Sequence, residues 1–239
     1  MKTGIIVLGL DSDSKGCRSF TERCADFLRE KGRKNVFAAF YRGTPYAGDV
    51  MREMHGTGID TFCILPLMIS EGKHTVWLMP KSVFLPDNFG SWTMLDGKDV
   101  ATRFSTALGS DPRMAEELVR REGKSEPGTA ILLVNRGSPH SSAERDASYY
   151  AEAFREAGWD SDYASAVRED EISKATRELI DKGNTSIRVV PLFINFEGKY
   201  SDIVREKLKA TGIDVRYSAP ISEITKYLEI LDSKVPEGW

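Results

Sequence analysis

The sequence lacks several features that would assign it to a specialised class of protein. No apolar stretch approaches the roughly 20 residues that a membrane span needs. The start of the chain runs straight into a strand-like segment, without the longer apolar core and cleavage site of a signal peptide. A formal net charge of −3 provides no basic excess for nucleic acid. We therefore expect a cytoplasmic protein that binds neither membrane nor nucleic acid.

Cysteine is scarce, and the common nucleotide motifs are absent. The three cysteines, Cys17, Cys24 and Cys63, form no CxxC pair, and an odd number of thiols fits a reducing compartment. Cys17 and Cys24 share one face of an expected helix, so we interpret them as small buried residues, with a metal or cluster role as the alternative. GxGxxG, Walker A and GxSxG patterns are missing, which argues against a nucleotide cofactor and a hydrolase.

Expected strands and helices alternate along the first part of the sequence. Residues 4–10 form a continuous apolar run, which is typical of a strand covered on both faces in a parallel sheet. Residues 11–14 offer caps for an amphipathic helix that Gly32 closes. Residues 36–41 and 61–67 are the next expected strands, and Pro45 is a candidate first residue of the helix between them.

The second part of the sequence repeats the first with a nearly constant offset. Three pairs of residues at equivalent strand ends are each 126 positions apart: Ser12 and Ser138, Arg42 and Arg168, His74 and Tyr200. Glu-Gly-Lys also occurs twice, at 71–73 and 197–199. This pattern predicts an α/β protein of two duplicated, Rossmann-like or flavodoxin-like three-layer domains with parallel sheets. The turn-rich segment 123–128, inside a connection of roughly residues 100–129, divides them into domains 1–124 and 125–239.

The sharpest candidate site is the loop after the third expected strand. Ligands of open α/β sheets bind beyond the carboxyl ends of the strands, so we expect ligand chemistry there and in a cleft between the two copies. In the loop Glu71-Gly72-Lys73-His74, the imidazole of His74 suits a metal ligand or a proton acceptor near neutral pH. A surface or supporting role is the alternative. His140 lies in a strand-end loop of the second copy, whereas His55, at a helix end, is expected to be structural.

Cationic and hydroxyl side chains follow the same strands. Guanidinium groups bind carboxylates bidentately, so this rim predicts a substrate with several carboxylates, and exposed surface charge is the alternative. The five cations are Arg42, Lys73, Arg136, Arg168 and Lys199. Ser12 and Ser138 are expected either to hydrogen-bond a substrate carboxylate or to cap the helices that follow.

These strand-end loops resemble those of a known family. The segments 66–74 (PLMISEGKH) and 131–139 (ILLVNRGSP) are similar to loops of the class II chelatases of tetrapyrrole synthesis. That family includes sirohydrochlorin cobaltochelatases, ferrochelatases and the related nickel chelatase, and the resemblance covers nearly the whole chain, including the duplication. It implies a lyase that inserts a divalent metal (cobalt, iron or nickel, as substrate) into a polycarboxylate tetrapyrrole such as sirohydrochlorin. The pathway would be cobalamin or siroheme-type porphyrin biosynthesis, and no nucleotide is needed.

The resemblance also implies roles for particular residues. His74 is expected to bind the metal and, with Glu71, to accept pyrrole protons, while Asp11 and His140 are the other candidate metal ligands. The expected substrate-binding residues are Ser12, Arg42, Lys73, Arg136, Ser138, Arg168, Lys199 and Tyr200.

Three positions where the family carries histidine hold other residues. They are Leu10, Arg136 and Tyr200, of which leucine has no donor atom and arginine stays protonated. Metal chemistry is therefore expected on the side of the first copy. Two alternatives stay open: a non-catalytic relative that binds a tetrapyrrole or its metal complex, and an unrelated small-molecule binding protein of periplasmic-binding-protein architecture. A duplicated chain contains both halves of a symmetric pair, so we expect a monomer or a weak homo-oligomer.

Overall fold

The computed structural model describes residues 2–138 and 141–239. The chain forms two compact units, each with its own sheet and helices. The first unit contains Met1–Ser110 and Thr225–Trp239, and the second contains Asp111–Ile224. Among the helices in the described part of the chain, none is both long and apolar enough to cross a membrane.

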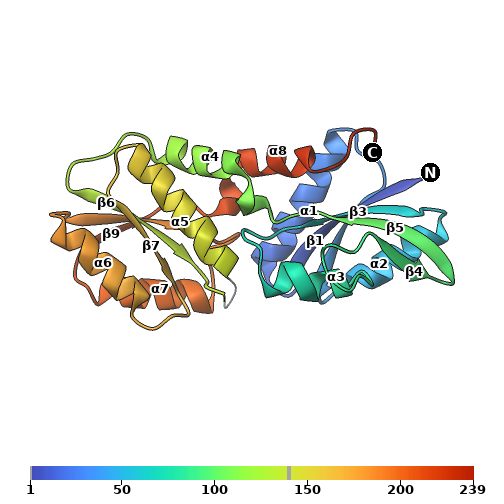
Figure 1. Cartoon of the computed structure of the whole chain (residues 1–239), viewed down its shortest axis with the longest axis horizontal. Helices are drawn as coiled ribbons and strands as arrows, with labels where there is room; N and C mark the ends of the chain where they lie inside the picture. The colour runs from blue at the N-terminus through green and yellow to red at the C-terminus, as the bar shows by residue number, and fades with distance from the viewer. Residues whose placement is uncertain (1, 139–140) are drawn as a thin grey trace. The chain divides into compact units, whose positions relative to one another are not determined.

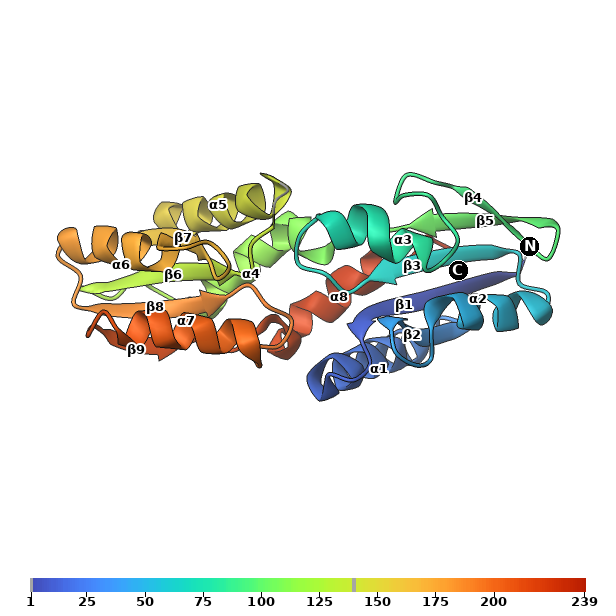
Figure 2. The same cartoon turned by 90° about the horizontal axis from the view of Figure 1, so that it is seen from below.

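The first unit is built around a five-stranded sheet with the order β2-β1-β3-β5-β4 (Figure 2). Its elements are β1 (Thr3–Asp11), α1 (Lys15–Glu30), β2 (Val36–Arg42), α2 (Ala47–Gly56), β3 (Thr61–Pro66), the π-helix η1 (His74–Leu78), α3 (Met79–Lys81), β4 (Trp92–Leu95), β5 (Lys98–Phe104), the 3-10 helix η2 (Leu108–Ser110) and α8 (Thr225–Ser233). The strand pairs β1–β2, β1–β3 and β3–β5 are parallel, while β4 is antiparallel to β5.

The burial of β1 explains its uninterrupted apolar sequence. Ile5, Ile6, Val7 and Leu8 are all buried, because α1 packs on the sheet and the side chains of α2 and α3 join the core cluster with Ile6 and Leu8. The same covering accounts for β3, all of whose residues are buried. The predicted parallel-sheet strands are confirmed at both places.

The second unit has a four-stranded, fully parallel sheet with the order β7-β6-β8-β9 (Figure 2). Its elements are α4 (Pro112–Glu122), β6 (Thr129–Asn135), α5 (Ser141–Glu156), β7 (Ser161–Ser165), α6 (Glu171–Asp181), β8 (Ser186–Pro191), α7 (Lys199–Lys209), β9 (Asp214–Tyr217) and the 3-10 helix η3 (Ile221–Glu223). Helix α4 contacts α5, and α6 contacts α7 (Figure 1). The predicted α/β class, with sheets dominated by parallel pairing, is confirmed for both units.

Two local expectations are wrong. Residues 100–104 were expected to lie in the connection between the two copies. Instead, the segment 98–104 forms β5 and joins the first sheet beside β3. It pairs with β4 through a two-residue turn in which Asp96 and Gly97 both have positive φ, a geometry that suits tight antiparallel hairpins. Pro45 does not begin α2, which starts at Ala47 with Tyr46 at its N-cap.

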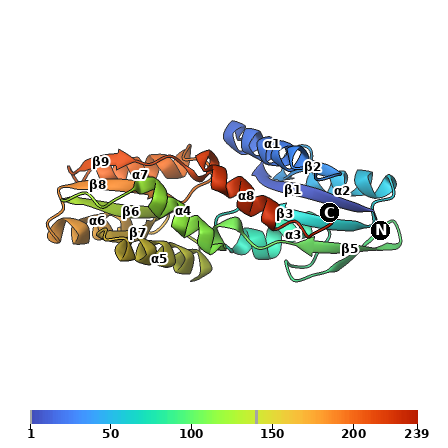
Figure 3. The same cartoon turned by 90° about the horizontal axis from the view of Figure 1, so that it is seen from above.

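The last helix of each sequence half belongs to the other compact unit. Asp111 caps α4 by accepting a hydrogen bond from the backbone N–H of Arg113, and α4 packs in the second unit. Helix α8, drawn in red in Figure 3, packs on α1, where the rings of Phe20 and Tyr227 lie 5.3 Å apart. The compact units therefore do not coincide with residues 1–124 and 125–239. We retain those ranges as our proposal for the duplicated copies.

The interpretation of the helix cysteines as buried residues is confirmed for Cys24 but not for Cys17. All three thiols are free, with Cys24 and Cys63 buried and Cys17 half-buried. Burial raises the pKa of Cys63 to about 12, against the lowering effect of the nearby Arg103 and Arg33, and it raises the pKa of Cys24 as well. Thiols that stay protonated at neutral pH are poor nucleophiles.

We therefore expect a thiol reagent such as DTNB to label one cysteine, Cys17, in the native protein. In denaturant all three should react. The measurement is the stoichiometry of thiolate release at pH 8, with the Cys17→Ser variant as control. Fast labelling of the native Cys17→Ser protein would contradict the burial of Cys24 and Cys63.

Candidate functional site

The candidate site of the first unit is assembled at the carboxyl ends of β1, β2 and β3. These strands are neighbours in the sheet, and the register pairs Asp11 with Arg42 and Leu8 with Pro66. The three loops that leave them therefore start side by side. This is the edge at which open α/β sheets bind ligands.

His74 begins η1, directly after the loop that leaves β3. The loop closes on itself because the backbone N–H of Gly72 donates to the hydroxyl oxygen of the buried Thr75 at 2.7 Å, and that hydroxyl donates to the Gly72 carbonyl at 3.1 Å. The half-buried imidazole of His74 lies edge-on to the ring of Tyr41, with the ring centroids 6.1 Å apart. Tyr41, at the end of β2, thus holds His74 beside the neighbouring loop.

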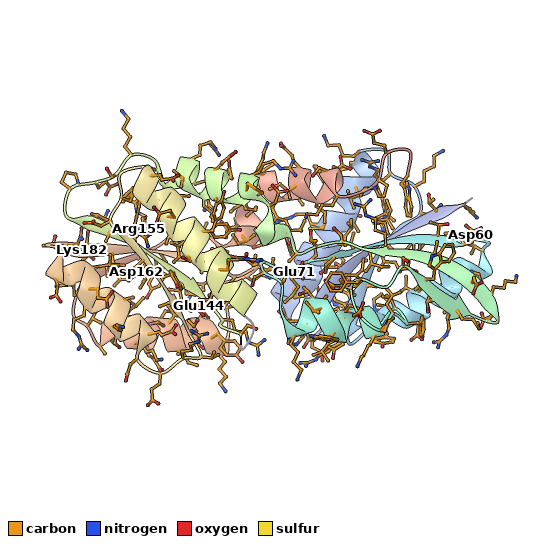
Figure 4. All side chains as sticks on the ribbon, viewed as in Figure 1. Asp60, Glu71, Glu144, Arg155, Asp162 and Lys182 are labelled. Carbon is orange, nitrogen blue, oxygen red and sulfur yellow. The ribbon has the colours of Figure 1, made fainter. Side chains whose placement is uncertain are left out.

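Glu71 is fixed by the segment that follows β5, the neighbour of β3 in the sheet. The backbone N–H of Ala107 donates to Glu71 Oε1 at 2.6 Å, and the N–H of Leu108 donates to the Met68 carbonyl at 3.0 Å. Figure 4 labels Glu71 in this loop. Gly109 lies so close that a Cβ there would be 1.9 Å from the Ile69 carbonyl oxygen. Residues 107–109 therefore brace the loop, a contact over 36 positions that the sequence did not reveal.

Ser12 joins the loops after β1 and β2. Its hydroxyl oxygen accepts from the Thr44 N–H at 2.9 Å, and its own N–H donates to the Arg42 carbonyl at 3.1 Å. Helix α1 is capped instead by Ser14, whose hydroxyl accepts from the Cys17 N–H. Ser14, and not Ser12, therefore caps α1. Substrate binding by Ser12 stays a prediction.

Arg18 also belongs to this site, although it was not predicted from the sequence. Its guanidinium donates to the carbonyls of Ser12 and Thr44 and lies over the ring of Phe40. The side chain thus ties together the loops that leave β1 and β2. A signal was present in its position on the first turn of α1, the turn nearest these loops.

Asp11, Arg42 and Lys73 are the other predicted site residues of the first unit. The Asp11 carboxylate accepts from the Asp13 N–H at 2.9 Å. Arg42 is exposed and its guanidinium lies 5.5 Å from the centroid of the Tyr41 ring. Among the described residues Arg42 makes no ion pair, so its charge is available to a ligand. Lys73 is exposed at the start of η1.

The second unit places an equivalent cation–aromatic pair at the carboxyl edge of its sheet. Arg136, exposed after β6, lies over the ring of Tyr200 at 4.9 Å from the centroid. Lys199 is exposed at the first position of α7, and Ser138 is half-buried. Asn135 supports this edge, because its amide donates to the Ala143 carbonyl and its oxygen accepts from Ser165. His140 lies outside the described residues.

Arg168 is already neutralised by two carboxylates. Its guanidinium nitrogens lie 2.8 Å from Glu171 and 3.1 Å from Glu144. Burial opposes ionisation of Glu171, but hydrogen bonds from Arg168 and from the Ser165 N–H hold its pKa below the usual value. Among the cations predicted to bind substrate carboxylates, Arg168 is therefore the one whose charge is least available. A substrate would have to replace Glu171 or Glu144.

The structure thus brings together some of the predicted residues but leaves the metal set untested. His74 and Arg42 both lie on Tyr41, and Arg136 lies on Tyr200. Within residues 2–138 and 141–239, no group of three or more His, Cys, Asp or Glu side chains is placed to hold a metal. The set of His74, Asp11 and His140 includes a residue outside that range. It stays a prediction, as does the cleft between the copies.

Comparison with protein families identifies the repeated sequence. A family model described as CbiX matches the chain twice, over residues 6–125 and 130–238. The predicted duplication is therefore confirmed.

Curated proteins of similar sequence include the following two. A sirohydrochlorin cobaltochelatase of Methanosarcina barkeri is 25% identical over 122 residues, which cover 50% of this chain and 94% of that protein. A probable sirohydrochlorin cobaltochelatase of Halobacterium salinarum is 28% identical over 193 residues, which cover 72% of this chain and 64% of that protein.

Solved structures share the fold. SirB from Bacillus subtilis with Fe3+ has a TM-score of 0.75 at 18% identity, and SirB from its subspecies spizizenii in complex with cobalt has 0.73 at 14%. Each comparison covers 98% of this chain and 94% of that chain. A multi-domain protein of Deinococcus radiodurans with structural similarity to chelatases has a TM-score of 0.74 at 19% identity. The present chain spans 55% of its length. These likenesses show a chelatase-like fold.

Proposed function

We propose that this chain, which belongs to the CbiX family of class II chelatases, inserts a divalent metal into a polycarboxylate tetrapyrrole such as sirohydrochlorin. The observation that carries the proposal is the placement of His74 and Glu71 on one braced loop at the ligand-binding edge of the first sheet. Cobalt, iron and nickel are the candidate metals, as substrates. A cytoplasmic location and a place in cobalamin or siroheme-type synthesis belong to the same proposal.

The reaction needs a group that delivers the metal and groups that remove protons. Two pyrrole N–H protons leave the macrocycle as the metal enters, so the overall charge of the ring and metal balances. A neutral imidazole binds divalent metals of this type, and a carboxylate accepts protons or supplies an oxygen ligand. We assign the first task to His74, with Asp11 as an oxygen donor on the adjoining loop. We assign the second to Glu71 and His74.

The carboxylates of the macrocycle need cations, and each sheet presents some at its own carboxyl edge. Arg42 and Arg136 fit this task because each is exposed and lies over a tyrosine ring, and a guanidinium binds a carboxylate bidentately. Lys73 and Lys199 add charge at the first turns of η1 and α7. Ser12, Ser138 and Tyr200 complete the proposed substrate contacts.

The test is a direct insertion assay with purified protein. Sirohydrochlorin is mixed with cobalt, nickel or ferrous ions, and the change in its absorbance spectrum is followed with and without the protein. We expect acceleration with at least one metal. If no metal is inserted faster than in the protein-free control, the catalytic proposal fails.

A non-catalytic relative that binds a tetrapyrrole or its metal complex is the second candidate. It is favoured by Leu10, Arg136 and Tyr200, which occupy positions where metal-binding residues are expected. Titration of sirohydrochlorin with tryptophan fluorescence as the readout separates the two candidates. Saturable binding without turnover selects the non-catalytic relative, and absence of binding removes both. The family match sets aside the unrelated periplasmic-binding-protein reading.

Arg136 and Arg168, the two arginines of the second unit that are predicted to bind substrate, should differ in their effect on binding. Arg136→Ala is expected to weaken sirohydrochlorin binding about 10-fold or more, because a charge-assisted hydrogen bond contributes roughly 1.5–3 kcal/mol. Arg168→Ala should change binding less than 3-fold, because Glu144 and Glu171 already neutralise its guanidinium. The measurement is the Kd from fluorescence quenching. A larger loss with Arg168→Ala than with Arg136→Ala would contradict these assignments.

A further inference from the structure

An apolar edge strand closes one side of the first unit's sheet. In the described part of the chain β4 pairs only with β5, so its other edge is open. Trp92 and Met94 point to one face and are 64% and 68% exposed, while Leu95 on the other face is buried in the core. Natural edge strands usually carry lysine, proline or a bulge that prevents pairing with another chain. The sequence Trp-Thr-Met-Leu of β4 contains neither a charge nor a proline.

The backbone of β4 has a defined direction of hydrogen bonding. In an antiparallel pair, residues alternate between those bonded to the neighbouring strand and those whose N–H and C=O point away from it. The two-residue turn at Asp96-Gly97 makes Leu95 a bonded residue, and the bond from the Thr102 N–H to the Ser91 carbonyl at 2.9 Å fixes the same phase. The backbone groups of Trp92 and Met94 therefore point away from β5, toward the open edge.

We propose that a second copy of this chain pairs antiparallel along β4, with a two-fold axis perpendicular to the sheet at Thr93. Such an axis keeps the exposed faces of both sheets on the same side. Two residues that lie opposite each other across the new strand pair must therefore point their side chains to the same face. Trp92 of each copy then lies opposite Met94 of the other. The outward N–H and C=O groups belong to these same two residues, so hydrogen bonding and side-chain facing exclude registers shifted by one residue. The register centred on Thr93 is the one that pairs both outward residues of each β4 with those of the other.

The contacts in this register cover the exposed apolar side chains of β4. Each tryptophan meets a methionine sulfur across the strands, and such sulfur–aromatic contacts are favourable. Trp92 and Met94 each present an area of about 150 Å². Two copies would bury about 600 Å² of these side chains, below the roughly 1,200 Å² at which stable interfaces begin. The structure therefore indicates a weak dimer, with a dissociation constant in the micromolar to millimolar range.

The first test measures mass against concentration. Sedimentation velocity of the wild-type chain is expected to show a rise from monomer toward dimer between about 10 μM and 1 mM. Met94→Pro removes an N–H that β5 does not use, so it should abolish the rise while the thermal unfolding midpoint stays near that of the wild type. Trp92→Lys should do the same by charging the edge. The matched control is Phe37→Lys on β2, the other edge strand of the same sheet.

The second test reads the register directly. In a Cys17→Ser background, Thr93→Cys should form a disulfide-linked dimer under mild oxidation, because the two-fold axis places both copies of this residue face to face. Trp92→Cys should not, because its own copies lie more than about 7 Å apart. A wild-type chain that stays monomeric at 1 mM overturns the proposal. So does dimerisation that Phe37→Lys abolishes and Met94→Pro does not, or equal cross-linking of the two cysteine variants.

Discussion

Replacing His74 with alanine is expected to lower the rate of metal insertion by about 100-fold or more, with little change in folding stability. The physical reason is that one imidazole is assigned two tasks, metal delivery and proton acceptance. A positioned acid–base group by itself contributes roughly 10²–10⁴-fold. No second histidine is placed at this edge among the described residues of the first unit, so the loss should not be compensated. The measurement is the initial rate of the sirohydrochlorin absorbance change at saturating metal.

His55→Ala is the matched control for this prediction. His55 lies at the end of α2, where its Nδ1 is 2.8 Å from the Ile59 carbonyl, so its role is structural, as the sequence predicted. We expect His55→Ala to cost about 1 kcal/mol of stability and to leave the insertion rate within 3-fold of wild type. If His74→Ala and His55→Ala lower the rate equally, His74 has no special part in the reaction. Retention of sirohydrochlorin binding by His74→Ala would separate a chemical role from a loss of substrate contact.

Gly109→Ala is expected to damage the site without changing any residue assigned to the chemistry. A Cβ at position 109 would lie 1.9 Å from the carbonyl oxygen of Ile69, so the backbone of one segment has to move. Residues 107–109 hold the loop through the Ala107–Glu71 and Leu108–Met68 hydrogen bonds, so that movement displaces Glu71. Forcing atoms into a packed region costs about 3 kcal/mol. We expect a lower unfolding midpoint and an insertion rate reduced about 10-fold or more.

Gly56→Ala provides the control. Gly56 ends α2 without a positive φ, and an added Cβ there would meet nothing within 4 Å. Alanine at this position should be neutral or slightly stabilising, because glycine loses more backbone entropy on folding. Both variants are compared by denaturant unfolding and by the insertion assay. Unfolding free energies for Gly109→Ala and Gly56→Ala that agree within 0.5 kcal/mol would show that the loop tolerates the added methyl group.

The first three strands of each copy, their order along the chain and the duplication could be read from the sequence. Continuous apolar runs such as residues 4–10 report burial on both faces, and that burial is a local property of each segment. The N-cap of α1 within residues 11–14 and the glycine after this helix were equally visible, because caps depend on a few neighbouring residues. The β4–β5 hairpin escaped notice because β4 is short and exposes Trp92 and Met94.

The sequence also placed His74, Glu71 and the cations at strand ends, because the carboxyl edge of a parallel sheet follows from strand direction alone. The sequence could not show which of those charges stay available to bind a substrate. Arg136 and Arg168 carry the same guanidinium after two neighbouring strands, β6 and β7. One lies on Tyr200, while the other is held between Glu144 and Glu171.

Only the tertiary structure decided these partners, together with the exchange of the terminal helices and the bracing of Glu71 by Ala107. Glu144 is 24 positions from Arg168, and Ala107 is 36 positions from Glu71. The periodicity of a segment reports which of its faces is covered, because that face repeats along the chain. The periodicity does not show which distant segment covers that face. A charged side chain acquires its role from the distant residues that it contacts.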